Sequence, residues 1–237
     1  MLSTNKPLLE FGRLDKCLSK YGKHFKCDNE KQIIYSSDIN ADDTFIILSG
    51  VIFLRRGENV LVGIAQAPFI MGLSDGVMKT DIQYRLITES DCTGYHLPAS
   101  QTINIIEECQ LWREAFCWLA WQNSMLELRD LQLIGNNSYD QIRATLISMM
   151  KWDDVLRSRI GVMNYIHQRT RISRSVVAEV LAALRKGGYI EMNKGKLVSL
   201  TVCLLSINSG CGNNLRFVPA QLCNQIVDTV THIGKTG

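Results

Sequence analysis

Residues 162–200 read VMNYIHQRTRISRSVVAEVLAALRKGGYIEMNKGKLVSL, and this stretch decides the fold of the C-terminal half. A helix is predicted over 155–170, with Ile160, Met163, Ile166 and His167 facing inward. After a short turn at Arg171 and Ile172, Ser173 is suited to cap a second helix. That helix carries one apolar face, formed by Val177, Val180, Leu181 and Leu184.

The second helix ends at Gly187-Gly188, a typical C-terminal stop, and two short strands are predicted to follow. These strands, YIEM and KLVSL, flank the turn sequence NKGK, which contains two lysines. Two helices joined by a tight turn and followed by a basic β-hairpin form a winged helix-turn-helix. We therefore expect a winged helix-turn-helix domain in this part of the chain.

Such a domain presents the start of its second helix to the DNA major groove, while the preceding turn and the wing approach phosphates. The candidate DNA-binding residues are Arg169, Arg171, Ser173, Arg174, Ser175, Lys194 and Lys196. Arg174 is suited to a bidentate contact with guanine O6 and N7. The alternative is a solvated basic face that binds no DNA, because charge alone does not identify a partner.

The net charge of +3 conceals two regions of opposite sign. Residues 1–138 hold 13 basic and 17 acidic residues, whereas residues 139–205 hold 11 basic and 5 acidic residues. An acidic body therefore carries a compact basic module, and the basic residues fall where a winged helix meets DNA. Double-stranded DNA is the partner that this charge distribution favours.

Upstream, residues 31–97 contain short runs rich in Ile, Val, Phe and Tyr that are separated by turn residues. The sequence RRGEN, centred on Gly57, predicts a hairpin turn. Several such strands favour a small antiparallel barrel or sandwich, since each is too short to bury its apolar face alone. The first 30 residues are predicted to contain a short helix. The fold class is therefore α+β.

A short helix is predicted from an N-cap at Ser100 to Glu107, and a long one from about Gln110 to Leu133. The long helix has two apolar stripes, and one domain covers only one of them. The second stripe is therefore predicted to pair with the same helix of another subunit, giving a homodimer; the alternative is burial within one chain. The second stripe consists of Trp112, Phe116, Leu119, Leu126 and Leu133. The candidate dimerisation residues, in contrast, are taken from the first stripe and are Leu111, Trp118, Trp121, Met125 and Leu128.

The polar residues 135–138 are predicted to separate two domains. The expected order is a sensor-like β domain at 1–109, a dimerisation helix and hinge at 110–138, and the winged domain at 139–205. A helix is expected from Tyr139 to about Trp152 within the last of these. Residues 206–237 form a C-terminal tail that is either a genuine extension or the product of an altered reading frame or cloning.

Over residues 31–205 the sequence resembles the CRP/FNR superfamily of bacterial transcription regulators. TFIILSGVIFL resembles the strand-turn-strand signature of the superfamily's β-roll, APFIMGL its phosphate-cassette region, and ISRSVVAEVLAALRKGGYI its recognition helix and following strand. The string YIHQRTRISRS, with LRKGGYIE after it, is similar to the IprA (YaiV) type of regulator, whose name refers to inhibition of hydrogen peroxide resistance. The resemblance implies a β-roll sensor, a dimerisation helix and DNA-binding transcription control linked to oxidative stress.

Departures from the superfamily pattern exclude part of its biochemistry. Its cyclic-nucleotide binders have a Glu after the cassette glycine and an Arg-Ser pair further on, whereas this chain has Leu73 after Gly72 and Ile82-Gln83 at the later place. Without that Arg a buried phosphate lacks its charged partner, so we expect no response to cyclic AMP. The recognition helix matches the superfamily at Arg174 only, with Ser175 and Glu179 at the other two places.

Iron-sulfur and haem cofactors are not expected, because the cysteines form no closely spaced motif and His24, His96, His167 and His232 show no ligand pattern. We expect no cofactor and no metal site. The candidate redox residues are the five thiols Cys17, Cys27, Cys92, Cys109 and Cys117. The alternative is that thiols such as Cys92 and Cys117 are small buried apolar residues.

No catalytic residues are predicted, since G-x-S-x-G, P-loop, H-E-x-x-H and C-x-x-C motifs are all missing from the sequence. The chain is therefore not expected to be an enzyme. It shows no secretory signal at its start and no apolar run of spanning length, which favours a cytoplasmic location without a membrane partner. RNA polymerase and an unidentified small-molecule or redox signal are further candidate partners. The alternative function is a ligand-binding or protein-interaction module whose winged domain docks a protein.

Overall fold

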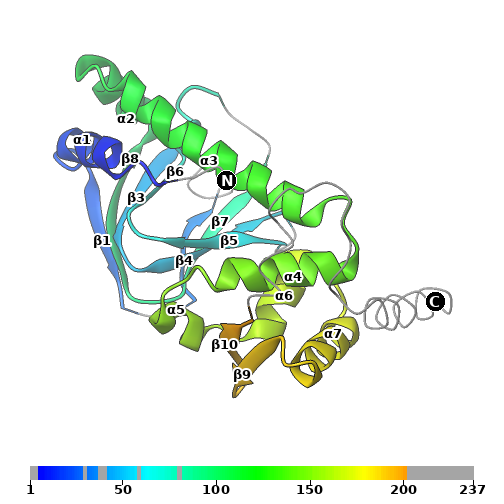
Figure 1. Cartoon of the computed structure of the whole chain (residues 1–237). Coiled ribbons are helices and arrows are strands. Elements are labelled where there is room, and N and C mark those ends of the chain that lie inside the picture. Colours follow the sequence, from blue (N-terminus) through cyan, green and yellow to red (C-terminus); the bar gives the residue numbers. More distant parts are fainter. Residues whose placement is uncertain (1–4, 29–30, 37–41, 58–59, 79–81, 202–237) are drawn as a thin grey trace. The chain divides into compact units, whose positions relative to one another are not determined.

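The computed structural model describes residues 5–28, 31–36, 42–57, 60–78 and 82–201 (Figure 1). The tail at 206–237 lies outside the described residues, so the expectations for it are not tested. Contacts within the chain divide it into two compact units, unit 1 at Met1–Asp130 and unit 2 at Leu131–Gly237.

Unit 1 contains eight strands in two four-stranded antiparallel sheets, counted over the described residues. The first sheet has the order β1-β8-β3-β6, and the second has the order β2-β7-β4-β5. The strand bounds are β1 Lys23–Cys27, β2 Ile33–Ser36, β3 Asp43–Ser49, β4 Val51–Arg56, β5 Val60–Gln66, β6 Phe69–Met71, β7 Tyr84–Thr88 and β8 Cys92–Pro98. This arrangement confirms the predicted antiparallel β fold, and β1 adds a strand that the sequence did not reveal.

The core of unit 1 begins with the apolar run of β3. Phe45, Ile46 and Ile47 are all buried, so both faces of this strand are covered. Tyr35 contacts Phe45 edge to face, with ring centroids 5.3 Å apart. The hairpin predicted at Gly57 joins β4 to β5, whose pairing places Arg56 opposite Val60.

Three helices accompany these sheets: α1 Leu8–Leu18, α2 Ala99–Glu108 and α3 Trp112–Leu133. α1 is the short helix predicted near the N-terminus, and it buries Phe11, Leu14 and Leu18. The prediction for Ser100 is wrong, because α2 begins one residue earlier and follows Pro98 without a side-chain cap. The fixed backbone angle of a proline suits it to this flanking place.

A tight turn separates α2 from α3. The amide of Gln110 donates to Glu107 O at 3.1 Å, and the amide of Leu111 donates to Ile106 O at 2.8 Å. These two bonds form a Schellman motif, which satisfies the last carbonyl groups of a helix. Its left-handed position is occupied by Gln110, with φ of 55°, where glycine is the usual residue.

Unit 2 contains four helices and a hairpin in its described part: α4 Ser138–Met149, α5 Asp154–Arg159, α6 Val162–Thr170, α7 Arg174–Lys186, β9 Ile190–Asn193 and β10 Lys196–Leu200. The single helix predicted at 155–170 is wrong, since the backbone leaves the helical region at Ile160 and α6 restarts after Gly161. The predicted inward position of Met163 is also wrong, because its side chain is exposed. The helices α4 and α7 and the hairpin agree with the prediction.

Within the described ranges, no helix combines the length and the apolar character that crossing a membrane requires.

Candidate nucleic-acid interface

The turn between α6 and α7 sets the direction of the second helix. Arg171 ends α6 in the left-handed conformation, with φ of 64°. The hydroxyl of Thr170 accepts a hydrogen bond from the amide of Ile172 at 3.2 Å, and His167 Nδ1 lies 2.8 Å from Ile172 O. These side chains satisfy the backbone of the turn and fix its path.

Helix α7 begins with the predicted cap. Ser173 Oγ accepts a hydrogen bond from the amide of Val176 at 3.4 Å and lies 3.1 Å from Ser175 Oγ. Arg174, the first residue of the helix, is exposed, as is Glu179 one turn later. The opposite face is buried and consists of Val177, Val180, Leu181 and Leu184. The exposed face at the start of α7 is therefore available to a partner.

The wing is a hairpin closed by Lys194 and Gly195, whose φ angles of 46° and 77° match a type I′ turn. Its tip is anchored to the start of α6, because Val162 N donates to Gly195 O at 3.0 Å. Lys196 donates from its Nζ to Arg159 O at the end of α5. The break between α5 and α6 thus provides the groups that hold the wing.

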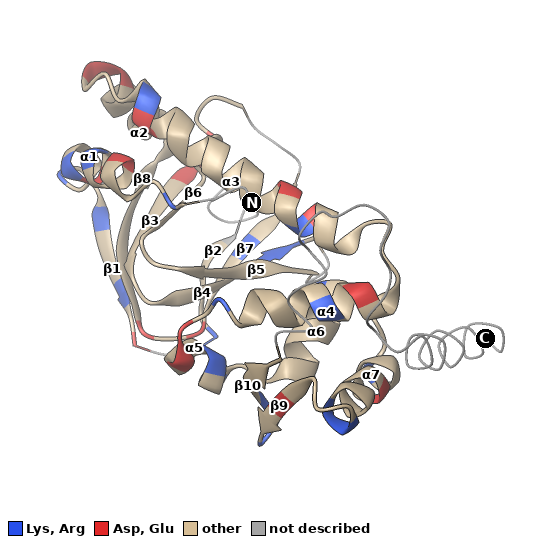
Figure 2. Cartoon of the chain, in the orientation of Figure 1, with Lys and Arg blue, Asp and Glu red and all other residues tan. Residues whose placement is uncertain are grey.

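The seven predicted DNA-binding residues occupy different environments. Arg171, Ser173, Arg174, Ser175 and Lys194 are exposed along the turn, the start of α7 and the wing, and Lys196 is half-buried. Figure 2 shows basic residues on α7 and at the tip of the β9–β10 hairpin. The structure thus brings a basic turn, helix start and wing into one unit.

Arg169 differs from the prediction that it faces phosphate. Its side chain is 7% exposed and donates from NH2 to Gln132 Oε1 at 3.0 Å. A buried guanidinium needs internal partners, and α6 turns this residue toward them. Arg169 is therefore placed as an interior residue of unit 2.

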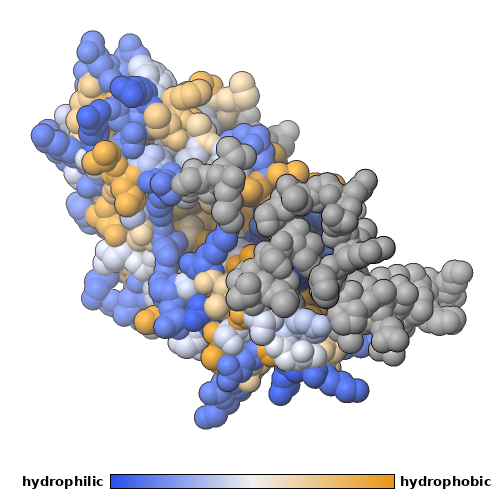
Figure 3. Space-filling model, in the orientation of Figure 1, coloured by the Kyte–Doolittle hydropathy of each residue, from blue (hydrophilic) through white to orange (hydrophobic). Residues whose placement is uncertain are grey.

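The predicted dimerisation residues also divide by burial. Leu111 and Trp118 are buried in the core of unit 1, and Trp121 packs against that core, so these side chains are covered by their own chain. This differs from the prediction that they contact another subunit. Met125 and Leu128 are half-buried. Of the second stripe, Trp112 and Phe116 are exposed, and Figure 3 shows apolar side chains on the surface around α1 and α3.

The cassette region of the β-roll is apolar where the sequence departs from the nucleotide binders. Gly72 has φ of 79°, and a Cβ there would lie 2.4 Å from Asp43 O, so the close approach requires glycine. The next residue, Leu73, is 3% exposed and belongs to the core. Ile82 is exposed. Leu73 therefore contributes to packing at the place where a carboxylate is expected in a nucleotide binder.

The five candidate redox thiols are free. Cys27 of β1 and Cys92 of β8 lie opposite each other in the strand register. Cys109 is exposed at the end of α2, whereas Cys17 of α1 and Cys117 of α3 are half-buried. Sequence spacing could not reveal the pairing of Cys27 with Cys92, because β1 and β8 lie far apart in the chain.

Within the described ranges there is no cluster of three or more His, Cys, Asp or Glu side chains suited to hold a metal ion.

Comparison with known proteins identifies relatives of both units. A family profile described as "Winged helix-turn-helix DNA binding" matches residues 138–203. A protein of Escherichia coli (strain K12) named "Inhibitor of hydrogen peroxide resistance" is 75% identical over 200 residues, which cover 84% of this chain and 97% of that protein.

Solved structures with the same fold have little sequence similarity to this chain. The c-di-GMP responsive global regulator CLP of Xanthomonas campestris has a TM-score of 0.66 at 13% identity, over 82% of this chain and 99% of that one. A putative transcriptional regulator of the CRP/FNR family from Eubacterium rectale has a TM-score of 0.64 at 13% identity, over 81% of this chain and 92% of that one. The family and these neighbours are regulators rather than enzymes.

Proposed function

The chain belongs to the family of proteins named inhibitor of hydrogen peroxide resistance, and on this premise we propose that it is a dimeric DNA-binding transcription regulator of the peroxide response. One observation carries the DNA-binding part: α7 starts at a capped serine and exposes Arg174 beside a basic turn and a basic wing. Solved structures at 13% identity share the fold of this chain, and a shared fold at that identity does not establish DNA binding.

In the proposed complex the start of α7 enters the major groove. Arg174 contacts a guanine through O6 and N7, and such a bidentate pair contributes about 1–3 kcal/mol of discrimination between bases. Arg171 and Lys194 contact phosphates from the turn and from the wing. Ser173 and Ser175 lie at the same helix start, where their hydroxyls can reach the phosphate backbone of the DNA. Lys196 remains bound to Arg159 O and contributes less.

Dimerisation doubles the recognition element. The exposed apolar residues Trp112 and Phe116 on α3 are the proposed contact with a second subunit. Two copies of α7 related by a two-fold axis would read two half-sites about one helical turn of DNA apart. We accordingly expect a near-palindromic operator.

The β-roll of unit 1 is proposed to receive the signal. A ligand or modification that favours one arrangement of the dimer would change the affinity for the operator. RNA polymerase is a further proposed partner of the bound dimer. The buried apolar Leu73 supports a signal other than a cyclic nucleotide.

The decisive experiment is a footprint on promoter DNA followed by titration of wild type and Arg174→Ala. We expect the variant to lose discrimination between the operator and a scrambled site by about 1–3 kcal/mol, while it keeps non-specific binding. Lys194→Ala should reduce the slope of log K against log salt by about 0.9. Lys196→Ala should reduce it less, because that ammonium already has a protein partner.

A matched control is Lys16→Ala, which removes one charge from an exposed site of α1 in unit 1. Its slope should equal that of wild type. Equal binding of wild type and an Arg171/Arg174/Lys194 triple alanine variant would refute the DNA-binding proposal. Failure to bind any promoter, with stable capture of one protein, would favour the alternative of a docking module.

A further inference from the structure

One acidic side chain of unit 2, Glu179 on α7, is not used by the described fold. Residues 139–205 hold 5 acidic residues, all within the described part of the chain. Four of them have partners there: Asp140 with Asn137, Asp153 with the amide of Leu156, Asp154 with Arg157, and Glu191 with Ser199. The carboxylate of Glu179 is exposed and makes no hydrogen bond or ion pair with any described residue.

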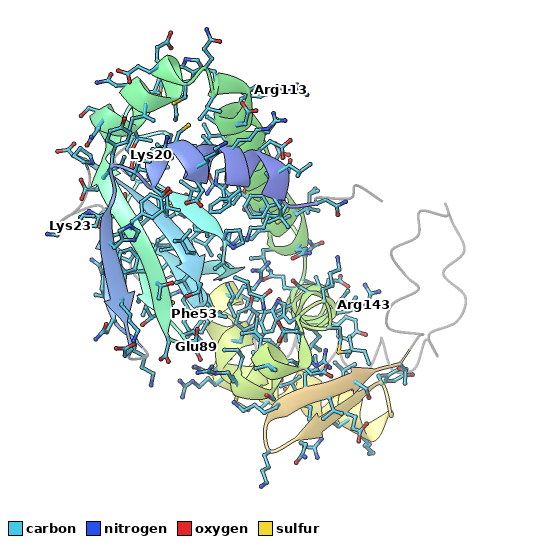
Figure 4. All side chains as sticks on the ribbon, turned by 90° about the vertical axis from the view of Figure 1, so that its left-hand side faces the viewer. Lys20, Lys23, Phe53, Glu89, Arg113 and Arg143 are labelled. Atoms are coloured by element: carbon cyan, nitrogen blue, oxygen red, sulfur yellow. The ribbon has the colours of Figure 1, made fainter. Side chains whose placement is uncertain are left out.

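The surroundings of Glu179 also provide no cation that could pair with it. On a helix, opposite charges three or four residues apart attract each other, but those positions on either side of Glu179 hold serine, valine and alanine. The helices α4 and α6 both pack against α7. Their arginines are interior, because Arg143, labelled in Figure 4, and Arg169 are each 7% exposed. The contacts of Glu179 therefore give it no role in the stability of unit 2.

Glu179 lies on the face that α7 turns away from its own core. The buried face of this helix is Val177, Val180, Leu181 and Leu184. The opposite face repeats at helical spacing and is exposed at Ser175, Glu179, Ala182 and Lys186. In the proposed complex the start of this outward face enters the major groove, and Glu179 lies one turn after Ser175. Its carboxylate is thus presented toward the base edges.

We propose that Glu179 reads a cytosine in each half-site of the operator by accepting a hydrogen bond from the N4 amino group of that base. The inference rests on the proposed function and extends it, because it adds a second base to the guanine assigned to Arg174. At a rise of 1.5 Å per residue, Arg174 and Glu179 lie about 7.5 Å apart along the helix axis. That distance exceeds one base-pair step of about 3.4 Å, so the two side chains contact different base pairs.

The chemistry of a carboxylate selects cytosine among the four bases. An ionised carboxylate only accepts hydrogen bonds. In the major groove guanine presents the acceptors N7 and O6, and thymine presents the acceptor O4, so both repel it. Adenine places its acceptor N7 beside its N6 donor, whereas cytosine presents the N4 donor alone. Cytosine therefore has the base edge that Glu179 fits best.

Electrostatic repulsion makes this contact a device for specificity. The phosphates of DNA repel an unpaired carboxylate, so Glu179 weakens binding to every sequence. The hydrogen bond from cytosine N4 offsets that repulsion only where the correct base is present. Discrimination through a repulsion that the correct partner relieves is a common way to reject wrong partners. Glu179 is thus expected to act in the opposite sense to Arg171 and Lys194, which attract all sequences.

The first test selects binding sites from randomised duplex DNA with the full chain. Wild type should select a cytosine at one position of each half-site, and Glu179→Ala should lose about tenfold of its preference at that position alone. The same variant should bind scrambled DNA more tightly than wild type. Glu179→Gln should shift the preference toward adenine, because a glutamine amide matches N6 and N7.

A matched control removes the same charge from the wing. Glu191 is exposed on β9 and accepts a hydrogen bond from Ser199. Glu191→Gln repeats the chemical change made in Glu179→Gln but should select the same sequence as wild type.

The second test identifies the atom that is read. The selected cytosine is replaced by a pyrimidin-2-one nucleotide, which lacks the N4 amino group. Wild type should lose about tenfold in affinity on this DNA relative to the effect of the same replacement on Glu179→Ala, so that the two changes are coupled.

The outcomes separate the inference from the proposed function. If wild type binds DNA and loses its guanine preference in Arg174→Ala, but Glu179→Ala selects the wild-type sequence, only the inference is overturned. It is also overturned if Glu179→Ala changes all positions equally, or if the pyrimidin-2-one replacement affects both proteins alike. If wild type binds no DNA, the proposed function fails and the reading of cytosine fails with it.

Discussion

The start of α7 in unit 2 differs from the interior of unit 1 in what its polar side chains contact. In unit 1 the ion pairs and hydrogen bonds join elements, as when Tyr95 donates to Asp15 Oδ1 at 2.7 Å and connects β8 to α1. In unit 2 the start of α7 and the wing leave Arg174 and Lys194 exposed. Charge that is satisfied internally supports a fold, whereas exposed basic charge on a cap and a turn is suited to phosphate. The difference makes unit 2 the candidate for the proposed contact with DNA.

The largest expected effect tests whether the two units are stable separately. Trp118 is fully buried and contacts Phe11 and Trp121, with ring centroids 5.7 Å and 5.0 Å away. Trp118→Ala should destabilise unit 1 by about 3–5 kcal/mol, because it creates a large cavity. Hydrogen exchange resolved by peptide should show the loss in unit 1 only. An equal loss of protection throughout α7 would show that the units unfold together.

A second pair of variants tests whether the buried Arg169 contributes more to the stability of unit 2 than the exposed Arg174. Arg169→Ala should cost about 1–3 kcal/mol of stability, because Gln132 Oε1 loses its donor in a buried setting. Arg174→Ala, at an exposed site, should leave stability within about 0.5 kcal/mol of wild type. Chemical denaturation monitored for unit 2 measures both. Similar losses for the two variants would contradict the assignment of Arg169 to the interior.

The cap of α7 separates folding from recognition within unit 2. Ser173→Ala should cost about 1 kcal/mol, since the amide of Val176 loses its acceptor. Ser173→Gly should recover most of that loss, because glycine is tolerated at this position. Ser175→Ala is the matched control, as it removes a neighbouring hydroxyl that caps no amide in the described structure. Thermal unfolding of the three variants gives the comparison.

The smallest expected effect concerns acid stability in unit 1. The hydrogen bond from Arg13 lowers the pKa of Glu114, and Arg13 itself is largely exposed. A carboxylate with a lowered folded-state pKa contributes stability above its unfolded pKa and loses it as pH falls through the folded value. Wild type should thus lose this contribution below about pH 4.3. Glu114→Gln should flatten that limb of the stability curve, and an unchanged limb would contradict the pairing.

Sequence patterns predicted the elements of this chain whose signals are local. Ser173, the apolar face of α7 and the NKGK turn each depend on residues within a few positions of one another, and all three appear as predicted. The antiparallel β fold of unit 1 was likewise predicted from short apolar runs. The helix at 155–170 failed, because the break at Gly161 is stabilised by the wing, as Val162 N donates to Gly195 O. A prediction made from neighbouring residues cannot include that contact, because Val162 and Gly195 lie far apart in the sequence.

By itself the sequence determined the order of the units, the opposite signs of their charge and the capped helix with an exposed basic start, because periodicity, capping and charge are local properties. Tertiary structure alone decided the environment of individual side chains. It buried Arg169 and Trp118, bound Lys196 to Arg159 O, and placed Cys27 opposite Cys92. Burial and pairing depend on which elements pack together, and residues far apart in the chain carry no local signal of meeting.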